Sequence, residues 1–293
     1  MTTTQLPMSS RTITLSHGRL LGYGECGHPQ GFPVFSFHGW PGSRIQSARY
    51  DSAARALDMR IIAPERPGFG LSDFQPRRTI TDWPSDVTAL ADRLGIDRFA
   101  VLGVSGGGPY ALACGWALPE RVTAITIGSG FGLVGEASVS SVLTPSQRFS
   151  FDQIVRFRRV HRATLGLIGL VVRADTRRAV AVGRRFLPEC DRSVLGDPVI
   201  QEISVADTHE ALSQGARAAA HDGQLLTHPW GFPLTEVRQP VHLWQGDADT
   251  VVPHAMGQHL ASLLPNAQPR YVPGEGHYLC IPRAQEMLAV LRP

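Results

Sequence analysis

A serine flanked by glycines stands where a strand-like run gives way to a helix-like run. The segment is Gly103-Val104-Ser105-Gly106-Gly107, and it follows the apolar run Phe99 to Val104. Side chains at Gly103 and Gly107 would collide with the neighbouring strand and helix, so a sharp turn needs glycine at both positions. A hydroxyl held on such a turn could act as a nucleophile. A phosphate-binding turn is the alternative, but it would need a lysine, which this chain lacks.

A serine hydroxyl is a poor nucleophile at neutral pH, so it needs a histidine base and a carboxylate to orient that base. His277 is the candidate base, because it follows the last predicted strand in Gly274-Glu275-Gly276-His277. Asp247 and Asp249 are the candidate acids, because both follow the run Val241 to Gly246. One of these two aspartates could simply cap a turn or the next helix. Most other histidines fall in helical or inserted segments and are typical of surface or core positions; they include His161, His209, His221 and His259.

Short β-branched or aromatic runs alternate with longer helical patterns along the chain, which predicts an α/β protein with a mostly parallel sheet. The predicted strands are Val34 to His38, Arg60 to Ala63, Phe99 to Val104, Val122 to Ile127, Val241 to Trp244 and Arg270 to Val272. The predicted helices are Ser43 to Leu57, Thr81 to Leu94, Pro109 to Leu118, His254 to Leu264 and Arg283 to Leu291. Arg11 to Leu15 and Arg19 to Gly24 are typical of an opening hairpin.

The strand and helix rhythm stops from about Gly132 to Pro233, where only arginine-rich helical segments occur. An insertion between two halves of one sheet explains this pattern better than a separate terminal domain. We therefore expect a core formed by residues 1–131 and 234–293, with a helical cap formed by residues 132–233. The cap determines the shape of any pocket, and it carries no motif that identifies a substrate.

The composition excludes several classes of protein. The 293 residues are 43% hydrophobic, which is enough for a sizeable core, and a net charge of +3 disfavours a nucleic-acid binder. The apolar run Ala163 to Val172 is about half of a bilayer span, so we expect no transmembrane segment. The first residues lack the basic start and the apolar run that are typical of a secretory signal, so we expect a cytoplasmic location. The cysteines, Cys26, Cys114, Cys190 and Cys280, lie far apart, so neither a disulfide framework nor a metal site is expected.

These motifs, taken in order, resemble the α/β-hydrolase superfamily, and within it the serine-dependent, esterase-like group with a helical cap. The order of nucleophile, acid and histidine matches as Ser105, Asp249 and His277. In that family the acid is the aspartate that shortly precedes Val-Pro, which selects Asp249, before Val252-Pro253, over Asp247. The resemblance covers roughly residues 11–131 and 232–293. It implies the α/β-hydrolase fold and a catalytic triad that needs no metal or organic cofactor.

Two further segments carry the resemblance. His38-Gly39-Trp40-Pro41-Gly42 matches the family's His-Gly-x-Pro turn, and by resemblance the backbone N–H groups of Trp40 and Gly106 form an oxyanion hole. The segment Glu65-Arg66-Pro67-Gly68-Phe69-Gly70-Leu71-Ser72 matches another family segment, with glutamate in place of its first aspartate. That replacement leaves the expected catalytic residues unchanged.

Related chemistries of the superfamily fit this chain less well. Epoxide hydrolases and haloalkane dehalogenases use an aspartate nucleophile, whereas position 105 is serine. Epoxide hydrolases also use cap tyrosines, and all five tyrosines of this chain lie outside the insertion: Tyr23, Tyr50, Tyr110, Tyr271 and Tyr278. Prolyl aminopeptidases recognise an ammonium group with cap acids. Between Arg156 and Arg185 this chain instead has nine arginines and one acid, Asp175.

The leading expectation is hydrolysis of a carboxylic ester or lactone of a small to medium organic molecule through an acyl-enzyme. The alternatives are hydrolysis of a carbon–carbon bond next to a ketone and cofactor-free peroxidative chemistry, because both use the same motifs. A non-catalytic ligand-binding protein is a third class, disfavoured because the whole triad is retained. The apolar run Leu165 to Val172 lies between two clusters of arginines, which suits a mobile helical lid with arginines at the mouth of the pocket. An anionic substrate is therefore a further hypothesis, and the alternative, which the pattern favours slightly, is that these arginines form an ordinary solvated surface. The sequence leaves the oligomeric state open.

Overall fold

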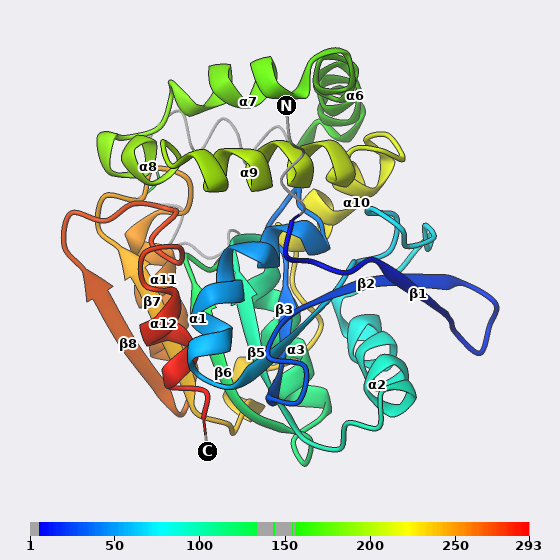
Figure 1. Ribbon diagram of the computed structural model, residues 1–293, viewed down its shortest axis with the longest axis vertical. Helices are drawn as coiled ribbons and strands as arrows, with labels where there is room; N and C mark the ends of the chain where they lie inside the picture. The colour runs from blue at the N-terminus through cyan, green and yellow to red at the C-terminus, as the bar shows by residue number, and fades with distance from the viewer. Residues whose placement is uncertain (1–5, 134–142, 144–153, 155, 293) are drawn as a thin grey trace.

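The computed structural model describes residues 6–133, 143, 154 and 156–292. Small parts of the two expected domains therefore lie outside the described residues: 1–5, 134–142, 144–153, 155 and 293. One eight-stranded sheet has the strand order β1-β2-β4-β3-β5-β6-β7-β8. Its first two strands pair antiparallel with their neighbours, and the other pairs are parallel, as the alternating sequence pattern predicts (Figure 1).

The strands occupy the predicted places with small shifts at their ends. They are β1 (Arg11–Thr14), β2 (Leu20–Gly27), β3 (Phe32–Phe37), β4 (Met59–Pro64), β5 (Phe99–Val104), β6 (Val122–Gly128), β7 (Val241–Gly246) and β8 (Ala267–Val272). β8 begins at Ala267 rather than Arg270, and β2 ends at Gly27 rather than Gly24. β8 is an edge strand whose residues are largely exposed, so its first half lacks the apolar pattern that reveals a buried strand.

Alternate residues of the strands point to opposite faces of the sheet, and each face has its own core. Phe99 and Val101 of β5 belong to one core, which is shared with α2 (Trp83–Arg93), α3 (Gly108–Ala117) and α11 (His254–Leu263). Ala100 and Leu102 belong to the other core, shared with α1 (Asp51–Ala56) and α12 (Ala284–Ala289). Both faces are covered, as in α/β folds generally.

The predicted helices exist, but one of them changes type along its length. Residues 43–57 form a 3-10 helix, η1 (Arg44–Tyr50), followed by the α-helix α1. A 3-10 turn, η2 (Ile80–Asp82), likewise precedes α2, and η4 (Leu234–Glu236) precedes β7. The described part of the insertion is helical, with α6 (Arg158–Ala174), α7 (Thr176–Arg184), α8 (Glu189–Val194), α9 (Pro198–Ala211) and α10 (Arg217–Leu226). We call α6 to α10 the inserted helices.

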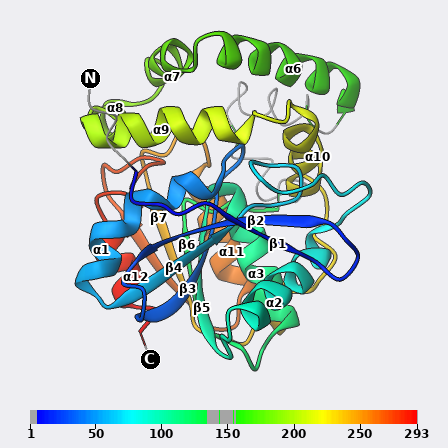
Figure 2. The same ribbon diagram turned by 45° about the vertical axis from the view of Figure 1, so that its right-hand side comes forward.

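The inserted helices lie together beyond one end of the strands, at the top of Figure 1, and the turned view of Figure 2 shows the same arrangement. The carboxyl ends of the parallel strands β5, β7 and β8 lie at this end of the sheet. Residues that directly follow these strands are therefore gathered beneath the inserted helices, which is where open α/β sheets bind ligands. No helix among the described residues is long and apolar enough to cross a membrane.

Candidate active site

The turn that carries Ser105 joins β5 to α3 through the 3-10 turn η3 (Ser105–Gly107). Ser105 has a φ of +52°, a left-handed conformation that residues other than glycine rarely adopt. A Cβ atom on Gly103 would lie 2.7 Å from the carbonyl oxygen of Gly107. One on Gly107 would overlap the carbonyl oxygen of Phe37 in β3. These close approaches explain why glycine is needed on both sides of the buried serine, as the sequence predicts.

His277 and Asp249 meet at the end of the neighbouring strands. His277 Nδ1 lies 2.9 Å from Asp249 Oδ2, and both side chains are buried. A carboxylate only accepts hydrogen bonds, so Nδ1 carries the proton and Nε2 of the neutral ring is left to accept one. Burial by itself would lower the pKa of His277. The nearby charge of Asp249, its hydrogen bond and the charge of Asp191 together raise that pKa above its usual value.

The two candidate aspartates have different partners. Asp249 Oδ1 accepts hydrogen bonds from the backbone N–H groups of Val251 and Val252, each at 2.8 Å, and its Oδ2 accepts one from Gln245. This leaves the Asp249 carboxylate fixed and aimed at the imidazole. Asp247 Oδ1 instead accepts the N–H of Gly274 at 2.7 Å, which ties two loops together. Of the two, Asp249 is therefore the partner of His277.

The turn expected to supply the second oxyanion donor lies against the serine turn. A Cβ atom on Gly106 would be 3.2 Å from the backbone nitrogen of Trp40, so the two N–H groups are close neighbours. Arg66 holds this turn, because its Nη1 donates to the carbonyl of His38 at 2.5 Å and its Nη2 to that of Gly39 at 2.8 Å. The Trp40 indole N–H donates to Ala219 of α10 at 2.7 Å.

A buried charge cluster connects Arg66 to the inserted helices. Asp222 of α10 accepts hydrogen bonds from Arg66 at 3.0 Å, from Arg78 at 2.6 Å and from the Tyr110 hydroxyl at 2.5 Å. Asp222 and Arg66 have no exposed surface. Burial by itself would raise the pKa of Asp222, but the two guanidinium groups and Tyr110 hold it well below its usual value. The cluster fixes α10 relative to the turn that contains Trp40.

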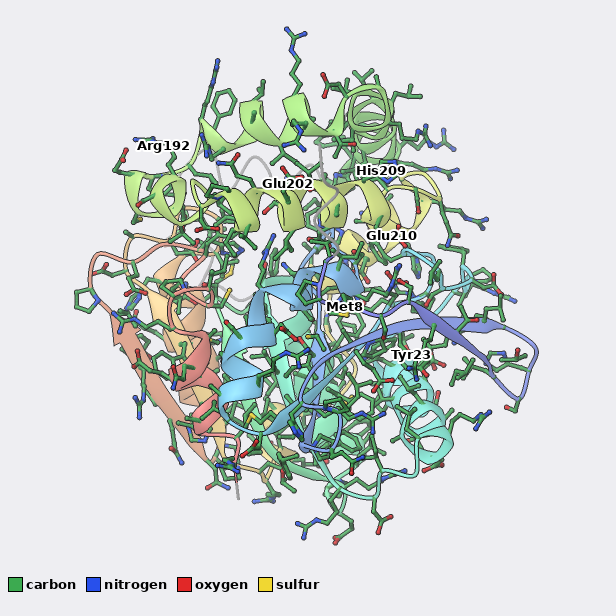
Figure 3. All side chains as sticks on the ribbon, in the orientation of Figure 1. Met8, Tyr23, Arg192, Glu202, His209 and Glu210 are labelled. Atoms are coloured by element: carbon green, nitrogen blue, oxygen red, sulfur yellow. The ribbon has the colours of Figure 1, made fainter. Side chains whose placement is uncertain are left out.

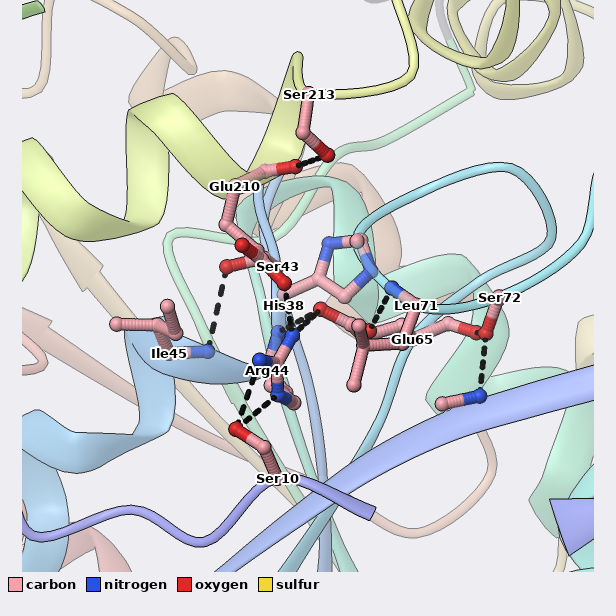
Figure 4. Close-up of polar contacts among 12 residues, drawn as sticks. Ser10, His38, Ser43, Arg44, Ile45, Glu65, Leu71, Ser72, Glu210 and Ser213 are labelled. Carbon is pink, nitrogen blue, oxygen red and sulfur yellow. Dashed lines mark hydrogen bonds and ion pairs between the residues drawn. The ribbon is translucent and has the colours of Figure 1, made fainter. Parts of the chain in front are cut away.

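Glu65, which replaces the family's aspartate, has a structural role. Its Oε1 accepts from Arg44 Nη1 at 2.7 Å, and its Oε2 accepts the backbone N–H of Leu71 at 2.7 Å (Figure 4). Arg44 Nη1 also contacts Glu210 of α9 at 2.5 Å. The glutamate therefore orders the Pro-Gly loop and links it, through Arg44, to an inserted helix.

Asp191 of α8 holds the histidine loop from the other side. Its Oδ2 accepts the backbone N–H of His277 at 3.0 Å, and its Oδ1 accepts that of Tyr278 at 2.9 Å. Burial raises the pKa of Asp191, and the two N–H donors oppose that rise. Sequence reasoning did not find Asp191, because no motif surrounds it in the insertion. Asp191 lies between Cys190 and Arg192, which are both half-buried, in a short helix with charged residues, and this pattern does not mark it as functional.

Ser105 and His277 line one cavity of about 520 Å³ beneath the inserted helices. Ile168 and Val172 of α6 contribute apolar wall. The cavity lies over the catalytic candidates and is large enough for a small organic molecule.

Three arginines also line this cavity: Arg49 of η1, and Arg177 and Arg184 of α7. Of the nine arginines between Arg156 and Arg185, Arg177 and Arg184 line the cavity. Arg49, on the other hand, comes from the core and not from the insertion. The four cysteines are free, and the described residues contain no group of three or more acidic, cysteine or histidine side chains that could hold a metal ion.

The chain belongs to the family described as alpha/beta hydrolase fold, whose model matches residues 33–284. The resemblance to the α/β-hydrolase superfamily is therefore confirmed. The acetyltransferase component of the acetoin cleaving system of Pseudomonas putida is 35% identical over 121 residues, which are 41% of this chain and 32% of that protein. A proline iminopeptidase from Xylella fastidiosa is 32% identical over 129 residues, which are 41% of this chain and 39% of that protein.

The chain thus matches about a third to two-fifths of the length of these curated relatives. Among solved structures, an esterase from Exiguobacterium antarcticum is similar with a TM-score of 0.69 and 15% identity, over 97% of this chain and 98% of that one. At this identity the likeness shows the fold alone. The family match shows that the chain is a member of the α/β-hydrolase superfamily.

Proposed function

We propose that this chain is a serine hydrolase that cleaves a carboxylic ester or lactone of a small to medium organic molecule. The observation that carries the proposal is the 2.9 Å contact between His277 Nδ1 and Asp249 Oδ2 in the cavity that Ser105 also lines. This arrangement supports a base whose Nε2 is free to accept a proton, in the same cavity as a serine with a left-handed backbone conformation. We also propose that residues 1–131 and 234–293 act as the catalytic core and residues 132–233 as its cap.

In the proposed reaction, Ser105 Oγ attacks the carbonyl carbon while His277 Nε2 accepts the hydroxyl proton. Asp249 stabilises the imidazolium that forms. The carbonyl oxygen becomes an oxyanion that accepts hydrogen bonds from the N–H groups of Trp40 and Gly106, and each such donor is worth about 3 kcal/mol in the transition state. The imidazolium then protonates the leaving alcohol, and the bond from carbon to that oxygen breaks. In the second half, His277 Nε2 accepts a proton from water as its oxygen attacks the acyl carbon. The bond from that carbon to Ser105 Oγ then breaks, and the imidazolium returns the proton to Oγ as the acid leaves.

An anionic substrate is the second part of this proposal. The guanidinium of Arg49 lines the cavity, its Nη2 donates to Ser204 Oγ at 3.0 Å, and its Nε is buried without a hydrogen-bond partner. The neighbouring carboxylates have other partners. Asp207 Oδ1 accepts two hydrogen bonds from Ser43, and the Asp191 carboxylate accepts the backbone N–H groups of His277 and Tyr278. Within the part of the chain that the structure describes, no carboxylate lies at ion-pair distance from Arg49. Its free N–H groups suit a substrate carboxylate.

The test is a panel of p-nitrophenyl esters of increasing acyl length, assayed with the wild-type protein and Ser105→Ala. We expect turnover of the shorter esters and its loss in Ser105→Ala, while the melting temperature of the variant stays near that of the wild type. A serine-directed covalent inhibitor should add its mass to the wild type and not to the variant. Near wild-type turnover by Ser105→Ala would reject the triad. Cleavage of a diketone substrate in place of every ester would favour the carbon–carbon hydrolases.

A further inference from the structure

Large apolar side chains are exposed mainly in one stretch of the chain, which includes α6 and α7. Among the described residues, 13 large hydrophobic side chains are exposed, and nine of them fall between residues 157 and 199. These nine are Phe157, Val160, Leu167, Ile168, Leu170, Val171, Val182, Phe186 and Val199. Leu167 is 64% exposed and Phe186 is 84% exposed. Scattered exposed hydrophobes are ordinary on a protein surface, but a gathering of this kind marks an interaction surface.

The exposed apolar residues of α6 lie on a different side of the helix from its buried residues. Its buried residues include Leu165 and Val172, which belong to a core cluster with the other inserted helices. Val160, Leu167 and Val171 are exposed at spacings of i, i+7 and i+11, which place them on one line along a different side of the helix. Packing against this protein's own core therefore uses one apolar side of α6 and leaves the other in contact with solvent.

The helices α6 and α7, which carry most of these exposed apolar side chains, are also strongly basic. Nine arginines and a single acid, Asp175, lie between Arg156 and Arg185. Asp175 caps α7 through the N–H of Arg178, and the carboxylate of Glu202 (labelled in Figure 3) pairs with Arg177. Five further arginines of α6, α7 and the turn after α7 are exposed, with no carboxylate of the described residues at ion-pair distance: Arg159, Arg162, Arg173, Arg178 and Arg185.

The positive charge of these helices favours an anionic partner over a second copy of the chain. A symmetric contact between two copies of the chain would set arginines of one copy against arginines of the other, and like charges repel. An anionic lipid surface presents phosphate groups to the arginines and acyl chains to the apolar side chains. Amphipathic helices with arginine beside a leucine-rich face bind membranes in this way.

We propose that the outer face of α6, α7 and the turn after α7 binds the surface of an anionic lipid bilayer. The exposed side chains around Leu167 and Phe186 enter the boundary between headgroups and acyl chains, while the arginines bind lipid phosphates. Figures 1 and 2 show α6 and α7 as the outermost layer of the molecule, so the rest of the fold does not obstruct such contact. The opposite side of α6 lines the cavity through Val172, so the bound face lies next to the proposed active site.

Vesicle co-sedimentation tests this proposal with the full chain. One set of vesicles contains phosphatidylcholine alone, and the other contains phosphatidylcholine mixed with phosphatidylglycerol. The apolar variant is Leu167→Ser with Val171→Ser, and the charge variant is Arg159→Gln with Arg162→Gln; none of these residues lines the cavity. Leu20→Ser is the matched control, because Leu20 is an exposed leucine of β2 and is not part of the inserted helices. Melting temperatures verify that every variant folds.

We expect the wild type and Leu20→Ser to bind the mixed vesicles equally, to bind pure phosphatidylcholine much less, and to dissociate as salt is added. The apolar variant should bind about tenfold more weakly, because two inserted side chains are lost. The charge variant should bind more weakly with a smaller salt dependence. Failure of the wild type to bind mixed vesicles overturns the proposal, as does unchanged binding by the apolar variant. A wild-type dimer in solution that the apolar variant dissociates would also overturn it, because the face would then be a self-association surface.

Discussion

Asp191 and His277 are 86 residues apart in the chain, yet the aspartate Oδ2 accepts the backbone N–H of the histidine at 3.0 Å. The contact joins an inserted helix to the loop that carries the proposed base. Asp191 is 1% exposed, and its second oxygen binds the N–H of Tyr278. The inserted helices therefore take part in positioning the imidazole as well as in closing the cavity.

Removal of this contact should lower kcat more than it raises KM. We expect Asp191→Ala to reduce kcat by about a hundredfold, because a small displacement of a catalytic group has effects of that order. Asp191→Asn keeps one acceptor oxygen and should lose less. Glu189→Ala is the matched control, since Glu189 lies on the same helix and its side chain is 82% exposed. A fall in melting temperature with kcat unchanged would assign Asp191 a purely structural role.

Replacement of the two aspartates should have very different effects. Asp249→Asn should cost about 10⁴-fold in kcat, because an amide beside Nδ1 favours the wrong imidazole tautomer. Asp247→Asn should change kcat by a few fold at most, since an amide oxygen can still accept the N–H of Gly274. Steady-state rates on one ester decide the matter. Equal losses, or the larger loss at Asp247, would transfer the role of acid to Asp247.

The pH profile should report the raised pKa of His277. The imidazole acts as a base only when it is neutral, so kcat/KM should fall as the pH drops through this pKa. Because the pKa is raised from 6.5, the acid limb should have a midpoint above that value. Asp191→Asn removes one of the charges that raise it, so the midpoint should move to lower pH. A wild-type midpoint at or below 6.5, or no shift in the variant, would contradict this account.

Loss of the Asp222 charge should destabilise the whole fold. Asp222→Asn leaves Arg66 and Arg78 buried without a counter-charge, which typically costs about 3–5 kcal/mol in the free energy of unfolding. The pKa of Asp222 is lower in the folded state than its ordinary value of 3.8, so its contribution is present above that pH and declines as the pH falls further.

Urea unfolding near neutral pH measures this loss. Asp92→Asn is the control, because Asp92 pairs with Arg121 while its side chain is 62% exposed, and exposed pairs contribute about 0–1 kcal/mol. If both variants lost the same small amount, the cluster would not be the stabilising feature that its burial indicates.

Charge selectivity should depend on Arg49. With neutral, anionic and cationic esters of equal size at low salt, we expect the wild type to have the highest kcat/KM for the anionic ester, and added salt to reduce the difference. Arg49→Gln should remove most of this preference through KM and retain turnover of the neutral ester. Arg177→Gln should have a smaller effect, because Arg177 is already paired with Glu202. A wild-type preference that survives in Arg49→Gln, or no preference at all, would reject the anionic substrate while leaving ester hydrolysis intact.

The sequence predicts the parts of this molecule that depend on neighbours in the chain. The alternation of strands and helices, the glycines around Ser105 and the place of Asp249 before Val252-Pro253 are local patterns, and the structure places each of them as expected. A local apolar pattern does not reveal a strand whose residues are largely exposed. The first half of β8 lacks an apolar signal because it lies exposed at the sheet edge.

The tertiary structure alone decides which distant side chains meet. Asp191 and the histidine loop, and Asp222 with Arg66 and Arg78, are joined by hydrogen bonds between residues 86 to 156 positions apart, which no local spacing encodes. The apolar residues of α6 are a similar case, because their periodicity predicts a helix but not which of its two apolar sides is buried. Burial and charge pairing depend on the packing of whole elements, so they are defined only when the inserted helices lie against the sheet.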